Sequence, residues 1–310
     1  MAVTAAQDCH SEGGAAWRPT SRNRLAPTEE STRPGWWPAP RRGLALTILL
    51  SILASPASAQ LRPLDPFEWR MFEGGRTVSA QVGGGWLRDQ RASLAGTEGT
   101  LVEAGNWRAF WRTGRVVLEA GGTVQRLFDE ESRFAAAEPG VRPADDGERR
   151  DAGDYRVLTA VRLTREAAPV AVALRFGARL PTTDNTVGLD RDATDFFATL
   201  GGRAARGRLA LQAEAGVGIF GTREDAFEQD DLLIYAARAE YAAGPVIPML
   251  TVVGQQVGSG HSEIRGNESL GEVRLGVRAG GRRWLLAEAV AGYTDFSPGF
   301  GVLVSAGMDW

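Results

Sequence analysis

Apolar and polar residues alternate over long stretches of this chain, and the charged residues fall on only one side of the alternation. Residues 207–221 show the pattern, because one parity is apolar and the other carries Arg208, Gln212 and Glu214. Side chains two residues apart lie on the same face of a β-strand, whereas a helix would scatter these charges around its circumference. The pattern therefore predicts strands with one apolar face and one charged face.

Stretches of this kind recur from about residue 77 onward and predict about twelve strands. They are expected near residues 77–88, 100–112, 115–126, 154–165, 169–180, 194–205, 207–220, 231–242, 246–257, 269–279, 283–294 and 300–310. Strands of soluble sheets usually have about five or six residues, whereas a tilted strand needs about nine to eleven to cross a bilayer. The expected strands are therefore long enough to span a membrane.

The connections between the expected strands alternate in length. Those after even-numbered strands are short, for example residues 113–114 and 206–207, and those after odd-numbered strands are mostly longer and polar, for example residues 128–153 and 258–269. Outer-membrane barrels have short periplasmic turns and long extracellular loops. The sequence thus predicts an all-β fold, a transmembrane antiparallel up-and-down β-barrel of about twelve strands, over residues 77–310.

In a membrane barrel the apolar faces point to lipid and the charged faces into the lumen, because an arginine facing lipid at mid-depth costs about 2–4 kcal/mol. If the inward charges pair across the lumen, the barrel is a closed body; if they segregate by sign, they line a wet channel for charged solutes. Gly177, Gly201, Gly216 and Gly276 lie between them, leave room inside and favour the channel. The expected pore-lining residues are Arg156, Arg162, Arg175, Arg179, Asp195, Glu214, Arg238, Glu240, Glu272, Arg274 and Glu288.

Residues 41–59 have the features of a signal peptide. Two arginines supply a positive n-region, an apolar core follows, and residues 57–59 form an A-x-A cleavage site. We expect residues 1–40 to be a disordered leader or the product of a misassigned start, and residues 60–76 to be a periplasmic or plug segment. Since no apolar run of about eighteen residues follows Gln60, a transmembrane helix is excluded. We therefore expect export to the outer membrane of a Gram-negative envelope, with its lipids as partners.

The last expected strand ends on an aromatic residue. One face of that strand holds Phe300, Val302, Val304, Ala306, Met308 and Trp310. This face resembles the signal that the outer-membrane barrel assembly machinery reads on its substrates, so that machinery is an expected partner. We expect Trp310 to lie in the periplasmic aromatic girdle.

Candidate catalytic residues are few. His261 is the only histidine after the signal peptide, and on a strand it would point away from its neighbour Ser262. A membrane-embedded hydrolase is therefore the weakest hypothesis, and we expect no catalytic residue and no enzyme.

Cofactor and nucleic-acid binding are not expected either. One histidine and no cysteine after residue 60 make a conventional zinc site unexpected. Acidic loop residues at 145–148, 184–195 and 230–231 suggest calcium binding but lack the D-x-D-x-D-G spacing, so no metal site is predicted. The formal net charge of −3 gives no basic footprint for nucleic acid.

Residues 174–202 resemble outer-membrane transporters grouped with the meta-pathway phenol degradation proteins. In that group a strand ends in a leucine-proline-threonine-glycine-aspartate turn and the chain re-enters with an aspartate before aromatic residues. The matching residues here are Leu180, Pro181, Thr182, Asp184, Gly188, Asp195, Phe196 and Phe197, and Thr183 stands where the group tends to have glycine. The resemblance implies uptake of small apolar or aromatic compounds.

The sequence supports two hypotheses of function. The leading hypothesis is an outer-membrane channel or transporter for passive passage of small molecules, with an unknown solute. The alternative is a closed structural or surface-interaction barrel without transport.

Overall fold

The computed structural model describes residues 61–310 except 183–185, 190, 192, 222–228 and 259–264. The expected leader and signal peptide lie outside the described residues, as does His261.

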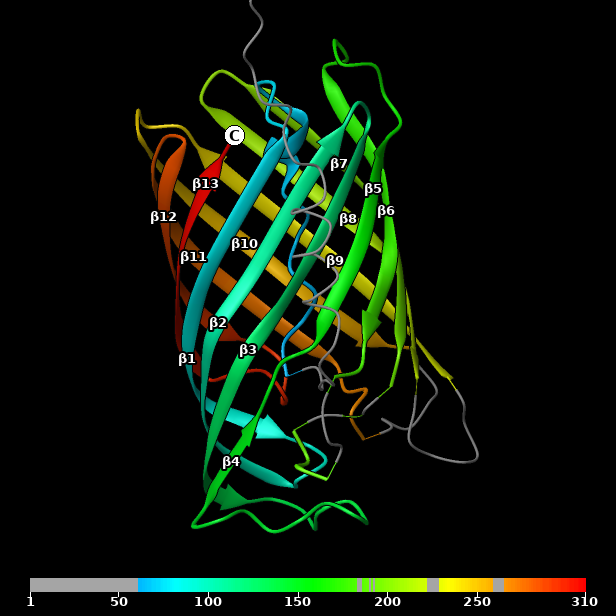
Figure 1. Cartoon of the computed structure of the whole chain (residues 1–310), viewed down its shortest axis with the longest axis vertical. Coiled ribbons are helices and arrows are strands. Elements are labelled where there is room, and N and C mark those ends of the chain that lie inside the picture. Colours follow the sequence, from blue (N-terminus) through cyan, green and yellow to red (C-terminus); the bar gives the residue numbers. More distant parts are fainter. Residues whose placement is uncertain (1–60, 183–185, 190, 192, 222–228, 259–264) are drawn as a thin grey trace, which may run out of the picture. The chain divides into compact units, whose positions relative to one another are not determined.

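Twelve strands of the described chain close into an antiparallel barrel, as the sequence predicted, and each strand pairs with its neighbours along the chain (Figure 1). The ring closes because β1 pairs with the last strand, β13, and a short extra strand, β4, pairs only with β3. The strands are β1 (Val78–Ala92), β2 (Thr97–Thr113), β3 (Val116–Arg133), β4 (Glu148–Asp151), β5 (Tyr155–Arg162), β6 (Val170–Leu180), β7 (Asp195–Arg206), β8 (Leu209–Gly221), β9 (Gln229–Tyr241), β10 (Val246–Val257), β11 (Leu270–Gly280), β12 (Arg283–Gly292) and β13 (Phe300–Asp309).

The structure extends two of the predicted strands and adds one. β2 and β3 reach Thr97 and Arg133, well beyond the expected 100–112 and 115–126, and β4 lies inside the expected loop 128–153. The sequence pattern missed the end of β3 because residues 129–133 are polar on both parities, so that no apolar face marks the strand there.

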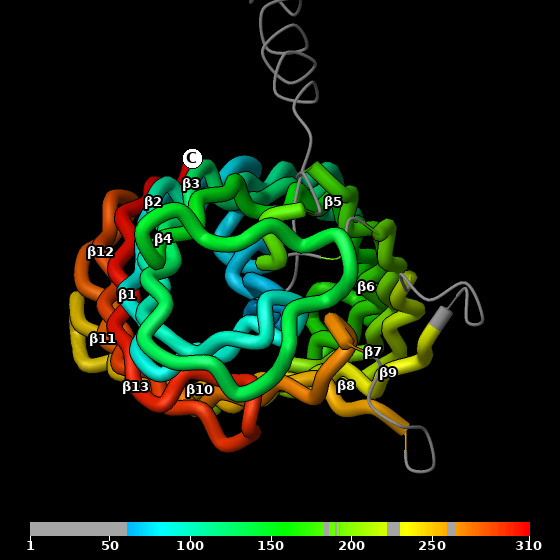
Figure 2. Tube along the Cα trace, turned by 90° about the horizontal axis from the view of Figure 1, so that it is seen from below, coloured from blue at the N-terminus to red at the C-terminus, as the bar shows by residue number. Residues whose placement is uncertain are grey.

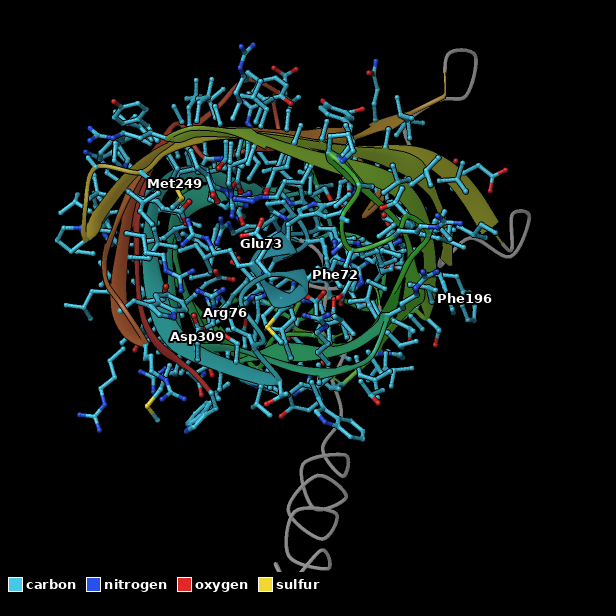
Figure 3. The ribbon with its side chains drawn as sticks, turned by 90° about the horizontal axis from the view of Figure 1, so that it is seen from above. Phe72, Glu73, Arg76, Phe196, Met249 and Asp309 are labelled. Carbon is cyan, nitrogen blue, oxygen red and sulfur yellow. The ribbon has the colours of Figure 1, made fainter. Side chains whose placement is uncertain are left out.

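The faces of the barrel are inverted relative to a soluble protein. Along β8 exposed and buried residues alternate, so that Leu211 and Val217 are exposed while Gln212 and Glu214 are buried. Figure 3 shows the same arrangement, with Phe196 on the outside of the ring. Leu275 on β11 is 65% exposed and lies at the middle of its strand. An apolar exterior on strands of this length fits the hydrocarbon layer of a bilayer.

Short turns gather at one end of the barrel and long connections at the other (Figure 1). The turn between β7 and β8 consists of residues 207–208, and Gly207 takes a positive φ of 61° that a tight hairpin requires. The opposite end carries the β3–β5 connection with β4, which forms a large arch in Figure 2. On this criterion the short-turn end is the periplasmic one.

The C-terminal residues close the ring at the short-turn end. The Trp310 amide donates to the carbonyl of Val78 at 2.8 Å, and the Trp310 carbonyl accepts from the amide of Thr77 at 2.9 Å. Phe300, Val302 and Val304 point outward, and Trp310 is 45% exposed.

In the part of the chain that the structure describes, no helix is long and apolar enough to cross a membrane.

Candidate functional site

Residues 61–76, here called the luminal segment, pass through the inside of the barrel (Figure 2). Leu61 packs in a cluster with Ala95, which lies in the turn between β1 and β2 at the long-loop end. The segment ends in a 3-10 helix, η1 (Trp69–Phe72), and then enters β1 at the short-turn end. Figure 3 shows Phe72 and Glu73 inside the ring at this end.

A three-residue repeat organises the first part of the luminal segment. The sequence LRP-LDP-FEW places Leu61, Leu64 and Phe67 three residues apart, and the residue after each of them is charged. Proline-rich chain favours the polyproline II conformation, which has three residues per turn, so such a repeat puts apolar and charged side chains on separate faces. A period of three matches neither the period of 2 of a strand nor the period of 3.6 of a helix, so the repeat gives neither pattern.

The apolar residues of the repeat fix the segment against the wall. Leu64 packs with Leu158 and Phe220, and Phe67 packs with Phe110 on β2. Phe67 also stacks edge-on with Trp69, with ring centroids 5.4 Å apart. These clusters are small, so the segment is held by side chains rather than by a continuous core.

The charged residues of the repeat form ion pairs with the wall. Arg62 donates to both carboxylate oxygens of Glu272 at 2.9 Å and lies 3.4 Å from Glu103. The two carboxylate oxygens of Asp65 take two different arginines, Oδ2 accepting from Arg156 at 2.7 Å and Oδ1 from Arg274 at 2.9 Å. The charges of the segment and the wall are therefore complementary.

Asp65 belongs to the luminal segment and not to a membrane-spanning strand. Burial by itself would raise the pKa of its carboxyl, but the charges of Arg156 and Arg274 outweigh that effect. The pKa of Asp65 is consequently held well below its ordinary value of 3.8, and the carboxylate is ionised at neutral pH.

The structure places all the predicted pore-lining residues on the inner side of the barrel, and seven of them contact the luminal segment. Besides those named above, Arg175 donates to the Asp65 carbonyl at 3.0 Å, and Glu214 accepts from the Phe67 amide at 2.9 Å. The seven that contact it are Arg156, Arg162, Arg175, Glu214, Glu240, Glu272 and Arg274.

The other four predicted residues contact the wall or the loops. Arg179 and Asp195 form an ion pair, and Arg238 donates to Thr251 at 2.9 Å. Glu288 is buried, and its Oε1 has no hydrogen-bond partner among the described residues. The inward charges thus pair with charges on nearby strands and on the luminal segment, and they do not segregate by sign.

One prediction about the interior is wrong. The glycines were expected to leave open space, but a Cβ at Gly216 would lie 1.9 Å from the Ala198 carbonyl oxygen, and one at Gly201 would lie 2.9 Å from the Trp69 ring. Neighbouring backbone and the luminal segment therefore occupy the space that these glycines provide.

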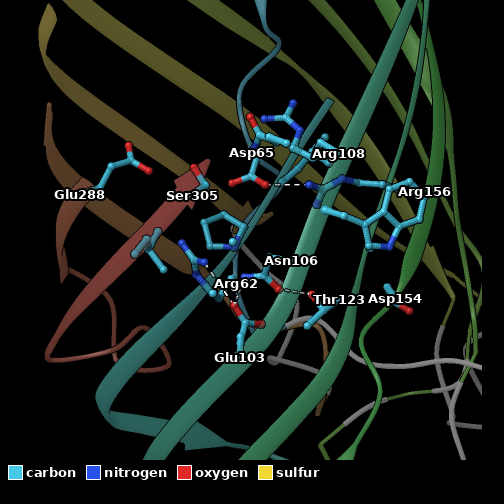
Figure 4. A pocket seen from close by; sticks show the side chains of 18 of the residues that line it. Arg62, Asp65, Glu103, Asn106, Arg108, Thr123, Asp154, Arg156, Glu288 and Ser305 are labelled. Atoms are coloured by element: carbon cyan, nitrogen blue, oxygen red, sulfur yellow. Dashed lines mark hydrogen bonds and ion pairs between the residues drawn. The ribbon is translucent and has the colours of Figure 1, made fainter. Parts of the chain in front are cut away.

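A cavity of about 140 Å³ remains beside Asp65 (Figure 4). Since a water molecule needs roughly 10–15 Å³ of such volume, the cavity has room for about ten waters. Phe197 and Leu303 contribute apolar lining. The charged lining consists of seven arginines and five acids, namely Arg62, Arg108, Arg126, Arg156, Arg179, Arg238, Arg274, Asp65, Glu68, Glu103, Asp154 and Glu288.

Three residues of this network, Arg108, Glu119 and Arg203, were not among those predicted from the sequence. Arg108 on β2 donates to Glu119 on β3 at 2.8 Å, and Arg203 on β7 pairs with Glu240 at 3.2 Å. All four lie on the charged parity of their strands, so the period-two pattern contained the signal. The pattern did not indicate which arginine would pair with which carboxylate.

Comparison with known proteins supports the fold. No family model matches the chain, and no curated protein matches it. Among solved structures the chain is similar to an outer membrane channel from Pseudomonas putida F1, with a TM-score of 0.58, 14% identity, and 80% of this chain and 100% of that chain covered. The chain thus has an outer-membrane β-barrel fold, which supports a location in the bacterial outer membrane in contact with its lipids.

Two further solved structures match with lower TM-scores. Outer membrane phospholipase A from Escherichia coli has a TM-score of 0.40 and 11% identity, with 80% of this chain and 97% of that chain covered. The Ralstonia pickettii toluene transporter TbuX has a TM-score of 0.36 and 9% identity, with 77% and 90% covered. One of these matched barrels is an enzyme. The prediction that this chain is not an enzyme is therefore wrong, because it excluded enzymes as a class.

Proposed function

We propose that the chain is an outer-membrane channel for small molecules whose lumen is closed at rest by the luminal segment. In this proposal residues 41–59 direct export, residues 60–76 are the plug, and the outward face that ends at Trp310 guides assembly of the barrel.

The observation that carries the proposal is the way in which the luminal segment is held. Among the described residues, 61–76 take part in no strand pairing, whereas every strand of the ring pairs on both sides. The segment contacts the wall through side-chain ion pairs, hydrogen bonds, cation–π contacts and apolar clusters. Its release therefore leaves the hydrogen-bonded wall intact, and a closed barrel does not depend on it.

The solute follows from two features. The cavity is mixed, with arginine-rich and aromatic lining, and it accommodates a molecule of about ten non-hydrogen atoms. The resemblance of residues 174–202 to transporters of the phenol degradation group adds small apolar or aromatic compounds as the class.

A closed structural barrel is the second candidate, and one specific observation favours it. The inward charges are paired with one another, and Glu119 on β3 alone bonds Arg108 on β2 and Arg175 on β6, both at 2.8 Å. A lumen held together in this way resembles a polar core, which stabilises a barrel without conducting anything.

Conductance in a planar bilayer separates the two candidates. The informative variant replaces residues 62–72 with a glycine-serine linker of equal length, which keeps the chain connected and removes the contacts with the wall. We expect small, infrequent conductance from the wild type and large, discrete conductance from the linker variant. Both proteins must first show the heat-dependent gel shift of a folded barrel. If both are silent over several salts and voltages, the channel proposal fails and the structural barrel is favoured.

A further inference from the structure

Asp65 forms a bridge between opposite walls of the barrel. Arg156 lies on β5 and Arg274 on β11, and these strands are six positions apart in the ring of twelve. Two guanidinium groups from opposite walls thus approach each other closely enough to share one carboxylate, at 2.7 and 2.9 Å. Figure 4 shows Asp65 and Arg156 at the edge of the cavity. At this level a single carboxylate group separates the two guanidinium groups.

Each of the two arginines has an acidic neighbour on the wall besides Asp65. Arg274 donates to Glu272 on its own strand at 2.7 Å, and Arg156 lies 3.9 Å from Glu119. The Nη2 atom of Arg274 is buried and has no hydrogen-bond partner among the described residues. A carboxylate ligand requires guanidinium N–H donors that the wall positions and that still have hydrogen bonds to give.

The charge of the cavity changes when the segment leaves. Of the charged residues that line it, Arg62, Asp65 and Glu68 belong to the luminal segment. The wall alone contributes six arginines and three acids, so it has an excess of positive charge. The lining of this cavity therefore favours an anion over a cation, whereas elsewhere in the lumen arginines and acids pair with one another.

We infer that Arg156 and Arg274 form a binding site for the carboxylate of a small organic acid, and that Asp65 is an internal competitor that occupies this site when no solute is present. The inference rests on the proposed channel function and adds a solute class to it. Phe197 and Leu303, which line the cavity, suit an acid with an apolar body. A solute that takes the two arginines displaces Asp65 and thereby frees the luminal segment.

The test measures binding of benzoate to the purified full chain in detergent by calorimetry. Asp65→Asn removes the competing charge and keeps the size of the side chain. When a competitor occupies a site for at least about nine-tenths of the time, its removal lowers the apparent Kd about tenfold or more. We therefore expect Asp65→Asn to bind benzoate at least about tenfold more tightly than the wild type.

Three controls make the result specific. Glu73→Gln neutralises another carboxylate of the same segment, one that pairs with Arg203 at the mouth, and should bind benzoate as the wild type does. Benzamide, which has the same ring without the charge, should show no gain on Asp65→Asn. The double variant Asp65→Asn with Arg156→Gln should lose the gain, and a heat-dependent gel shift shows that each variant is folded.

Failure of this inference is distinguishable from failure of the channel. Equal benzoate affinity in wild type and Asp65→Asn, or an equal gain for benzamide, overturns the carboxylate site even if the linker variant conducts. If the linker variant shows no conductance, the channel proposal fails, whatever the result of the benzoate measurement. Benzoate should also raise the wild-type conductance, and Asp65→Asn should conduct more than the wild type in its absence. A response to benzoate that is the same in wild type and in the double variant would likewise contradict the site.

Discussion

An arginine on the outer face at mid-depth should destabilise this barrel far more than the same arginine near a turn. Leu275 lies at the centre of β11, is 65% exposed, and pairs with Leu250 and Ala289 on the neighbouring strands. Leu209 is the first residue of β8, next to a short turn, and is 46% exposed. The two leucines therefore differ mainly in depth.

The magnitude follows from two contributions. Full burial of a leucine in an apolar phase is worth about 1.5–3 kcal/mol, so the exposed fractions correspond to about 1–2 kcal/mol at Leu275 and about 0.7–1.4 kcal/mol at Leu209. An arginine costs about 2–4 kcal/mol more at the midplane and about 0–1 kcal/mol near the interface. Leu275→Arg should thus lower the free energy of unfolding by about 3–6 kcal/mol, and Leu209→Arg by about 1–2 kcal/mol.

The assay is urea unfolding of both variants in lipid vesicles, with Leu275→Ala as the control for the lost leucine alone. The difference of about 2–4 kcal/mol corresponds to a factor of roughly 30–700 in the folded-to-unfolded ratio. If Leu275→Arg costs no more than Leu209→Arg, the outer face does not contact lipid at that depth. The inverted arrangement of apolar and charged faces would then be refuted.

Three more predictions follow from particular contacts. Gly216→Ala should destabilise the barrel by about 1–3 kcal/mol in urea unfolding because its Cβ would overlap the neighbouring strand, whereas Gly281→Ala, with no atom within 4 Å, should be neutral within about 0.5 kcal/mol. The hydroxyls of Tyr235 and Tyr293 are 2.8 Å apart, so Tyr293→Phe should cost about 0.5–1.5 kcal/mol, and adding Tyr235→Phe should cost little more; full additivity would show that the hydroxyls do not interact. Because the folded-state pKa of Asp65 lies well below 3.8, its contribution is lost only as the pH falls through that lowered value. Burial raises the pKa of Asp154, which also lines the cavity, to about 6, so the test uses Asp154→Asn, whose resting conductance should be the same at about pH 7 and about pH 5. An opening with a midpoint near pH 5 would contradict this assignment of charge.

Much of the wall could be predicted because the signal is local. Whether Glu214 faces in and Val217 faces out depends only on the parity of their positions in β8, and the period of two is set by the backbone of a single strand. The same parity placed the predicted charges inside and Val302 and Val304 outside. The order of the strands followed as well, because consecutive antiparallel strands joined by short turns pair with each other.

Only part of the structure of the luminal segment could be predicted from the sequence. Its triplet repeat is visible in the sequence, and it separates Leu64 from Asp65 by face. The sequence does not show that the repeat lies inside the barrel, since a proline-rich segment at the periplasmic mouth would have the same composition. The space at Gly201 was likewise misread, because the atoms that fill it come from Trp69.

The sequence by itself determined that this chain forms a ring of long strands with apolar side chains outward and charged side chains inward, because alternation is a property of each strand alone. Only the tertiary structure decided that Arg156 and Arg274, on opposite walls, meet at the same carboxylate of Asp65. Which charges face one another across the lumen depends on the number of strands, their stagger and their tilt together, and no single stretch of the chain contains that information.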